Sequence, residues 1–222
     1  ARRNQLRVGI VNVTGYAGVE LARLLHSHPE VELVSVTGRS ESGKKLREVF
    51  PHLWDIDCTI TNNLEEEVDV AFSALPHKAS AEACLPLIET GVKVIDISAD
   101  FRLKDLDAYQ QWYGGTHPAP NLVKEAVYGL TEIHRDAIRS ARLIANPGCY
   151  PVSAILALTP AVKHGLIQPS IIVDSKSGVS GAGRGLSLTT HYGEVNDNLS
   201  AYALGGHRHL PEITQELGAV NT

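Results

Sequence analysis

The sequence lacks the features that would indicate a membrane span, a nucleic-acid partner or a disulfide scaffold. No apolar run approaches the ~20 residues that a transmembrane helix needs, and no signal peptide is visible at the start. The formal net charge of −5 leaves no broad basic surface, which argues against nucleic acid as the main partner. The three cysteines, Cys58, Cys84 and Cys149, are scattered and odd in number, so they favour a reducing compartment over a disulfide framework. We therefore expect a cytoplasmic protein, with an organellar matrix or stroma left open.

Methionine is also absent from the 222 residues, and the chain begins at Ala1. It ends at Thr222 without a recognisable stop pattern, so we expect a processed or trimmed chain whose C-terminal portion is missing. The content of 43% hydrophobic and 20% charged residues is ordinary for a globular protein. The length suffices for one large domain or two small ones.

Hydrophobic periodicity predicts alternating strands and helices. The apolar run Leu6–Val13 predicts a buried strand, a helical pattern follows Gly18 as far as Pro29, and Val31–Thr37 predicts a second strand. This is a βαβ unit. Further strands are expected over 68–75, 92–97 and 143–145, and further helices over 80–89 and 151–164. The alternation predicts the α/β class, with a Rossmann-type, doubly wound, mostly parallel sheet.

The first strand-to-helix turn carries a dinucleotide-binding signal. It reads Thr14-Gly15-Tyr16-Ala17-Gly18, and glycines there let backbone N–H groups approach a pyrophosphate at a helix start. Asn12 stands where the first glycine of this motif is usual, but Asn tolerates a positive φ better than most residues. The motif is weak alone, and its place at the start of a βαβ unit strengthens it.

The end of the second strand indicates which nucleotide is bound. NAD-binding proteins usually place Asp or Glu there, whereas this chain has Arg39 and Ser40. A guanidinium and a hydroxyl suit a 2′-phosphate, so we expect NADP. The alternative is that Arg39 is simply a solvated loop charge.

The turn Pro147-Gly148-Cys149-Tyr150-Pro151 places one thiol just before a long apolar helical pattern. A helix start offers unpaired N–H groups, and that environment favours the nucleophilic thiolate. The alternative is a small structural cysteine at a strand-to-helix turn. A nucleophilic cysteine needs an acid/base partner elsewhere in the chain.

The run Gly206-His207-Arg208-His209-Leu210-Pro211-Glu212 offers such a partner. Its spacing lets Glu212 orient a histidine ring, and we favour His207 as the acid/base while spacing alone leaves His209 open. Arg208 and Arg184 are candidates to grip anionic substrate groups. His-x-His also permits a zinc interpretation, but without a third ligand cluster nearby we expect no metal.

Seven strings together resemble the N-acetyl-γ-glutamyl-phosphate reductase family, in the wider group that includes aspartate-semialdehyde dehydrogenases. Besides the glycine turn, the cysteine turn and the run 206–212, they are Ala74-Leu75-Pro76-His77, Asp96-Ile97-Ser98-Ala99-Asp100-Phe101-Arg102-Leu103, Tyr128-Gly129-Leu130 and Ser177-Gly178-Val179-Ser180-Gly181-Ala182-Gly183-Arg184. They span nearly the whole chain in order. The cysteine and His-Arg-His strings are specific, and the glycine turn is not. Asn12 departs from the family pattern, and family members are longer.

The resemblance implies an NADPH-dependent reduction in arginine biosynthesis. Cys149 would attack the acyl phosphate of N-acetyl-γ-glutamyl phosphate, and hydride would reduce the resulting thioester to the semialdehyde. The implied catalytic residues are Cys149, His207 and Glu212. The implied NADP-binding residues are Thr14, Gly15, Tyr16, Ala17, Gly18, Arg39, Ser40, Leu75, Pro76, Ser177 and Gly178. The implied substrate-binding residues are Ser180, Gly181, Arg184, Arg208 and His209.

The resemblance also implies two domains and a homo-oligomer, either a dimer or a tetramer. We expect an NADP-binding domain over 1–147 and an incomplete α+β substrate and dimerisation domain over 148–222, with a strand over 170–175. The region 100–121 is expected to be rich in loops. Two alternatives stay open: a related reductase of aspartyl or carrier-linked aminoadipyl phosphate, and a non-catalytic NADP-binding module.

Overall fold

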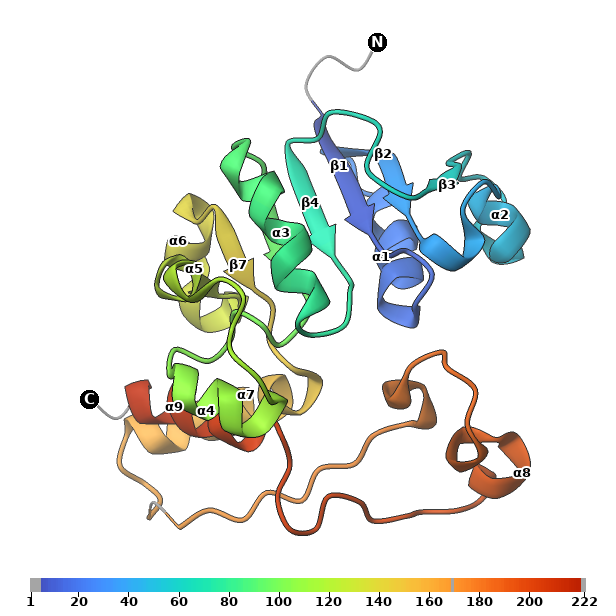
Figure 1. The fold of residues 1–222 in the computed structure, drawn as a ribbon. Coiled ribbons are helices and arrows are strands. Elements are labelled where there is room, and N and C mark those ends of the chain that lie inside the picture. Colours follow the sequence, from blue (N-terminus) through green and yellow to red (C-terminus); the bar gives the residue numbers. More distant parts are fainter. Residues whose placement is uncertain (1–4, 169, 221–222) are drawn as a thin grey trace.

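The computed structural model describes residues 5–168 and 170–220. Its centre is a parallel sheet of seven strands in the order β3-β2-β1-β4-β5-β7-β6 (Figure 1). The strands are β1 (Leu6–Val11), β2 (Val31–Thr37), β3 (Ile60–Thr61), β4 (Val70–Ser73), β5 (Lys93–Asp96), β6 (Val127–Tyr128) and β7 (Leu143–Ala145). The doubly wound α/β fold expected from the sequence is therefore confirmed.

Helices connect the strands and cover both faces of the sheet, and further helices follow the last strand. They are α1 (Tyr16–His26), α2 (Leu46–Val49), α3 (Ala79–Glu89), α4 (Leu106–Tyr113), α5 (Pro120–Glu125), α6 (Thr131–Ser140), α7 (Cys149–Lys163), α8 (Tyr192–Val195) and α9 (Leu210–Val220). The chain leaves β1 through α1 toward β2 and leaves β4 through α3 toward β5, in opposite directions along the sheet. Because such crossovers are right-handed, α1 and α3 lie on opposite faces. The carboxyl ends of β1 and β4 therefore form the switch point where this fold binds ligands.

The core follows from the apolar periods of these elements. Val8, Ile10 and Val36 are buried beneath α1, where Ala22 packs against them. A second cluster joins α3 to β5 and β7 through Cys84, Val94 and Leu143 and includes the buried ring of Phe101. Both clusters fix the strands whose carboxyl ends carry the motifs.

The region 100–121 is more regular than the sequence suggested. It contains α4, which begins where the Asp105 carboxylate accepts hydrogen bonds from the amides of Asp107 (2.9 Å) and Ala108 (3.3 Å). Tyr109 and Tyr113 on this helix stack on each other and are buried. The aromatic residues thus form a small core of their own rather than a loop.

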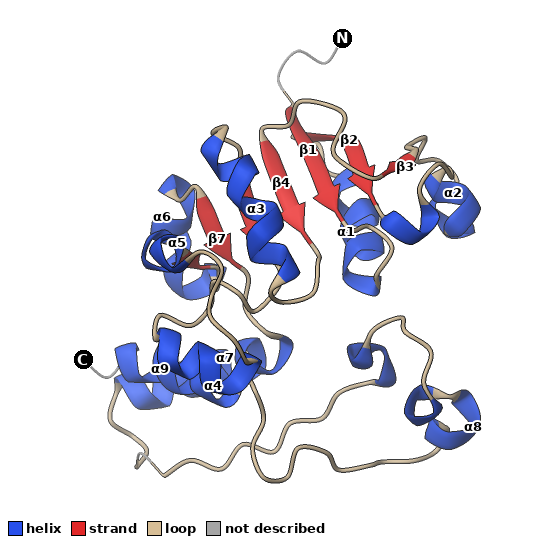
Figure 2. Ribbon diagram, in the orientation of Figure 1, coloured by secondary structure: helices blue, strands red, loops and turns tan. Residues whose placement is uncertain are grey.

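The strand expected over 170–175 is not formed. Residues 170–178 are extended chain without strand pairing, and Figure 2 shows only helices and loops after β7. A strand needs a neighbour to accept and donate its backbone hydrogen bonds, and no described strand lies beside this segment. Its apolar side chains stay exposed, as do others along the excursion that runs to α9, among them Ile172, Leu186 and Leu204.

Candidate active site

The first glycine turn begins at the carboxyl end of β1. Asn12 adopts a φ of 67°, the positive value expected of a residue in the place of a glycine. Its side-chain amide donates to the carbonyl of Ala74 at 2.9 Å, and its backbone N–H donates to Thr37 Oγ1 at 3.0 Å. Asn12 therefore ties the ends of β1, β2 and β4 together at the switch point.

The two glycines of the turn do different work. A Cβ on Gly18 would lie 2.5 Å from the carbonyl oxygen of Asn12 and 2.7 Å from Val13 Cα, so this position must be glycine for α1 to pack on β1. A Cβ on Gly15, the N-cap of α1, would meet nothing within 4 Å. The open space at Gly15 and the exposed helix start fit a pyrophosphate.

The other expected cofactor residues lie at the same edge of the sheet. Arg39 and Ser40 are exposed and follow β2 after Gly38, and Leu75 and Pro76 follow β4. Since β2, β1 and β4 are neighbours in the sheet, their carboxyl ends share one edge. Ser177 and Gly178 are exposed on the excursion between α7 and α9.

Arg184 lies against the first glycine turn. Its Nη1 donates to the carbonyl of Thr14 at 3.0 Å, and its guanidinium sits 4.8 Å above the ring of Phe50. Both contacts join the glycine-rich stretch that holds Ser180 and Gly181 to the first βαβ unit. The expected grip of Arg184 on the substrate stays a prediction.

The cysteine turn connects β7 to α7. Gly148 is the N-cap of α7 and Cys149 is the first residue of the helix, with an exposed side chain. A Cβ on Gly148 would lie 2.8 Å from His209 Nε2 and 2.9 Å from Arg102 Nη1. The turn is therefore packed tightly on its inner side and open at the thiol.

The two histidines of the His-Arg-His run lie beside this turn. The ring of His207 meets the ring of Tyr150 edge-on at 5.2 Å, and the rings of His207 and His209 are 4.7 Å apart. The backbone N–H of His209 donates to His207 Nδ1 at 3.1 Å, so the neutral His207 ring carries its proton on Nε2. Burial, together with Arg208, lowers the pKa of His207 below 6.5.

His209 has a different environment. Its side chain is buried, and its Nδ1 has no hydrogen-bond partner among the described residues. Burial, followed by the charge of Arg102, lowers the pKa of His209 to about 3. His209 is therefore neutral at pH 7, whereas the more exposed His207 is better suited to exchange protons with solvent.

The pKa of His209 predicts an acid-sensitive stability. Because the folded value of about 3 lies below the ordinary histidine pKa of 6.5, the unfolded chain takes up the proton first, and stability falls as the pH drops below 6.5. Between pH 6.5 and 5, we expect the wild type to lose about 1.5 kcal/mol more unfolding free energy than His209→Gln. Urea titrations of both proteins at each pH measure this difference.

The comparison with His209→Gln removes an opposing contribution. Burial raises the pKa of Asp96 to about 6, so the folded state takes up this proton first and gains stability as the pH falls through that value. Asp96 titrates in both proteins and cancels in the difference. Equal slopes for the two proteins would contradict the assignment of His209 as a buried neutral ring.

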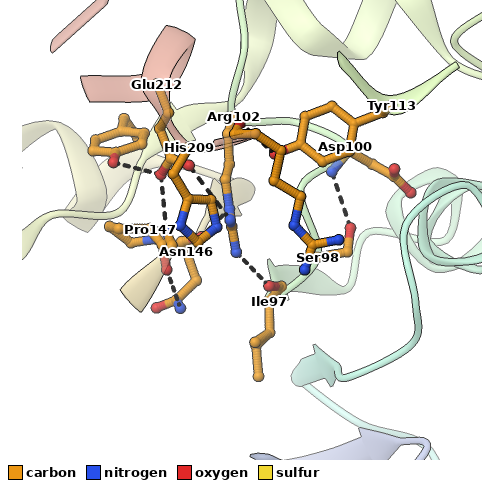
Figure 3. A network of polar contacts seen from close by, with 12 residues as sticks. Ile97, Ser98, Asp100, Arg102, Tyr113, Asn146, Pro147, His209 and Glu212 are labelled. Atoms are coloured by element: carbon orange, nitrogen blue, oxygen red, sulfur yellow. Dashed lines mark hydrogen bonds and ion pairs between the residues drawn. The ribbon is translucent and has the colours of Figure 1, made fainter. Parts of the chain in front are cut away.

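Glu212 corrects one expectation from the sequence. Its carboxylate is fully buried and accepts hydrogen bonds from the Gly148 N–H at 2.8 Å and from the Tyr128 hydroxyl at 2.7 Å (Figure 3). Its other oxygen lies 3.4 Å from Arg102 Nη1. No hydrogen bond joins Glu212 to His207 among the described residues, because α9 turns this side chain toward the cysteine turn.

No sequence pattern indicated a role for Arg102. Its Nε donates to the carbonyl of Asn146 and its Nη2 to the carbonyl of Ile97, both at 2.7 Å. The signal for Arg102 and Tyr128 was their place in two of the resemblance strings, although neither string says what they contact. In the structure, Arg102 and Tyr128 belong to the site because residues far apart in sequence meet at the carboxyl ends of β5, β6 and β7.

A cavity of about 910 Å³ opens beside the histidines. Tyr150, His207 and His209 line it, together with residues of α7 and α9 and of the segments 165–168, 171–177 and 199–206. In the described residues, no group of three or more His, Cys, Asp or Glu side chains is arranged to hold a metal ion. Among all the residues that the structure describes, no helix is long and apolar enough to cross a membrane.

Comparison with known families identifies the family to which the chain belongs. A sequence model described as "Semialdehyde dehydrogenase, NAD binding domain" matches residues 7–141. The chain belongs to the semialdehyde dehydrogenase family. A second model of this family, described as its dimerisation domain, matches residues 149–222.

Curated relatives of this semialdehyde dehydrogenase family member are named N-acetyl-gamma-glutamyl-phosphate reductase. One from Dehalococcoides mccartyi strain BAV1 is 61% identical over 211 residues, covering 95% of this chain and 62% of the relative. One from Pelotomaculum thermopropionicum is 52% identical over 221 residues, covering 97% of this chain and 64% of the relative. The chain therefore spans less than two thirds of the length of these relatives.

A solved structure shares the fold of this family member. Aspartate semialdehyde dehydrogenase II from Vibrio cholerae superposes with a TM-score of 0.63 at 19% sequence identity. The match covers 96% of this chain and 67% of that one. At this identity, the likeness supports the fold alone.

Proposed function

We propose that the protein containing this chain reduces N-acetyl-γ-glutamyl phosphate to N-acetylglutamate semialdehyde with NADPH and releases phosphate. The observation that carries the proposal is the exposed Cys149 at the start of α7, with His207 against the ring of the next residue, Tyr150. The identity of 61% to a reductase of that name supports the substrate. The glycine turn at the switch point supports the cofactor.

Cys149 serves as the nucleophile. Its sulfur attacks the carbonyl carbon of the acyl phosphate, a C–S bond forms, and the C–O bond to phosphate breaks with its electron pair leaving on phosphate. When bound, NADPH supplies the hydride that reduces the thioester. The helix start at Cys149 carries partial positive charge, which favours negative charge on the reacting groups.

His207 exchanges the protons of the reaction. It takes the thiol proton at Nδ1, which gives up the hydrogen bond from the His209 amide, and the resulting imidazolium passes its Nε2 proton to the oxygen of the thiohemiacetal. Arg208 is adjacent and supplies positive charge for an anionic substrate group. His209, neutral and buried, packs against the turn and lines the cavity beside it.

The choice of NADPH over NADH rests on the end of β2. We expect Arg39→Ala to raise the KM for NADPH by about 10- to 100-fold, because the substitution removes a charged hydrogen bond to the 2′-phosphate. The KM for NADH, which lacks that phosphate, should change less than twofold. Initial rates with both nucleotides measure the split, with Arg47→Ala as a control at another exposed arginine. Equal effects on both nucleotides would contradict the role of Arg39.

The assembly is proposed to be a homo-oligomer, either a dimer or a tetramer, located in the cytoplasm. Support comes from the description of the model that matches residues 149–222 as a dimerisation domain. Cys58, Cys84 and Cys149 are all free, which suits a reducing compartment.

The deciding experiment is phosphate-dependent reduction of NADP by the whole gene product with N-acetylglutamate semialdehyde. Turnover with this aldehyde, and little with aspartate semialdehyde or a carrier-linked aminoadipate semialdehyde, is the expected result. Turnover with another aldehyde would assign a related acyl-phosphate reductase. Binding of NADPH without turnover on any of the three would reduce the protein to a nucleotide-binding module.

A further inference from the structure

The amide that precedes Cys149 is held by a buried carboxylate. Glu212 Oε1 accepts the Gly148 N–H at 2.8 Å, and Gly148 is the N-cap of the helix that begins with Cys149. The same oxygen accepts the Tyr128 hydroxyl at 2.7 Å. Glu212 has no exposed surface, so this bond is shielded from competing water.

The carboxylate is itself held from the sheet. Arg102 Nη1 lies 3.4 Å from Glu212 Oε2, while the rest of its guanidinium binds the carbonyls of Ile97 and Asn146. These carbonyls follow β5 and β7 directly. Arg102 therefore connects the carboxyl edge of the sheet to α9, and Figure 3 shows its side chain between Glu212 and the carbonyl of Ile97.

This cluster restricts where the backbone of the cysteine turn can lie. A Cβ on Gly148 would meet His209 Nε2 at 2.8 Å and Arg102 Nη1 at 2.9 Å, so the backbone already touches its neighbours on the inner side. A buried charge of this kind persists only where every oxygen has a partner, and here two donors and a guanidinium provide them. A carboxylate serving the histidine would contact an imidazole instead.

We propose that Glu212 is a positioning residue that acts through the Gly148 amide to fix the start of α7 and hence the sulfur of Cys149, with Tyr128 and Arg102 fixing the carboxylate. The effect on the reaction rests on the proposed function. The effect on the turn does not. Glu212 thus works on the nucleophile rather than on the acid/base.

The test compares Glu212→Ala, Glu212→Gln and Tyr128→Phe with Glu216→Ala as the matched control. Glu216 is the next acidic residue on α9, is also buried, and pairs with His134 at 3.1 Å, away from the cysteine turn. In the whole gene product, Glu212→Ala should lower kcat by about 100-fold, the cost of a misplaced reacting group, with the KM for NADPH within twofold. Glu212→Gln keeps an acceptor oxygen for the Gly148 N–H and should recover kcat to within tenfold of the wild type.

The pH profile of kcat separates the two roles of Glu212. If Glu212→Gln is as inactive as Glu212→Ala and the acidic limb of the profile moves, the carboxylate serves the histidine, which overturns the proposal. An equal loss of kcat in Glu216→Ala would also overturn it, because the effect would then be general to α9. Tyr128→Phe, a substitution that a buried ring tolerates, covers the case in which Glu212→Ala does not fold. It should lower kcat three- to tenfold, and no change would contradict the cluster.

Hydrogen exchange tests the turn without the reaction. The hydrogen-bonded amides of this turn are those of Gly148, bound to Glu212, and Val152, bound to the Gly148 carbonyl. Both should exchange at least tenfold faster in Glu212→Ala than in the wild type or Glu216→Ala. If the wild type lacks reductase activity but this difference is present, the proposed function fails and the positioning role stands. Unchanged exchange together with unchanged kcat in a folded Glu212→Ala would sink the positioning role alone.

Discussion

Replacing Cys149 by serine should lower reductase turnover by at least about 10³-fold, because an alcohol at this position cannot supply the thiolate that attacks the acyl phosphate. The side chain is exposed at the first position of α7, so the substitution fits without repacking the core. Binding of NADPH should stay within twofold of the wild type. Steady-state kinetics with the acyl phosphate and a fluorescence titration with NADPH measure the two effects.

Cys58→Ser is the matched control for this substitution. Cys58 is only partly buried, and burial raises the pKa of its thiol, so it is no competing nucleophile at neutral pH. The control variant should keep turnover within threefold. Retention of turnover within tenfold by Cys149→Ser would rule out the nucleophile.

His207→Ala should lower kcat by about 10²- to 10⁴-fold, the range for loss of a general acid/base. Its pKa is lowered by burial and by Arg208, which places the acidic limb of the wild-type kcat/KM profile below pH 6.5. The variant should lack that limb. Rates measured from pH 5 to 9 give both results.

His209→Ala is the comparison that decides between the two histidines. A ring whose pKa is about 3 stays neutral over this pH range, so its loss should leave the limb in place and reduce kcat mainly through looser packing at Gly148. If His209→Ala abolishes activity and removes the limb while His207→Ala does not, the two assignments are reversed.

Local sequence patterns predicted the parts of the fold that depend on near neighbours. Val31–Thr37 and Leu143–Ala145 are strands over the residues expected, and the helix expected over 151–164 begins two residues earlier, at Cys149. Asn12 was expected to accept a positive φ and does. In each case, the deciding interactions lie within a few residues or follow from a continuous apolar run.

The failures involve partners that the sequence does not specify. A β-branched run over 170–175 predicted a strand, but a strand forms only beside another one, and the pattern does not reveal whether one is present. Spacing paired Glu212 with His207, five residues away, whereas its partners are Gly148, Tyr128 and Arg102. The missed helix α4 did have a local signal, because Asp105 caps it.

The contacts of Glu212 also determine the order in which parts of the site form during synthesis. Glu212 leaves the ribosome 64 positions after Gly148 and 84 after Tyr128, whereas Asn12 meets its partners within 25 and 62 positions. Since chains fold from the N-terminus as they emerge, the nucleotide turn is in place first. Under the proposed roles, the thiol reaches its working position only after α9 has emerged, so a nascent chain would bind nucleotide before it could catalyse the reaction.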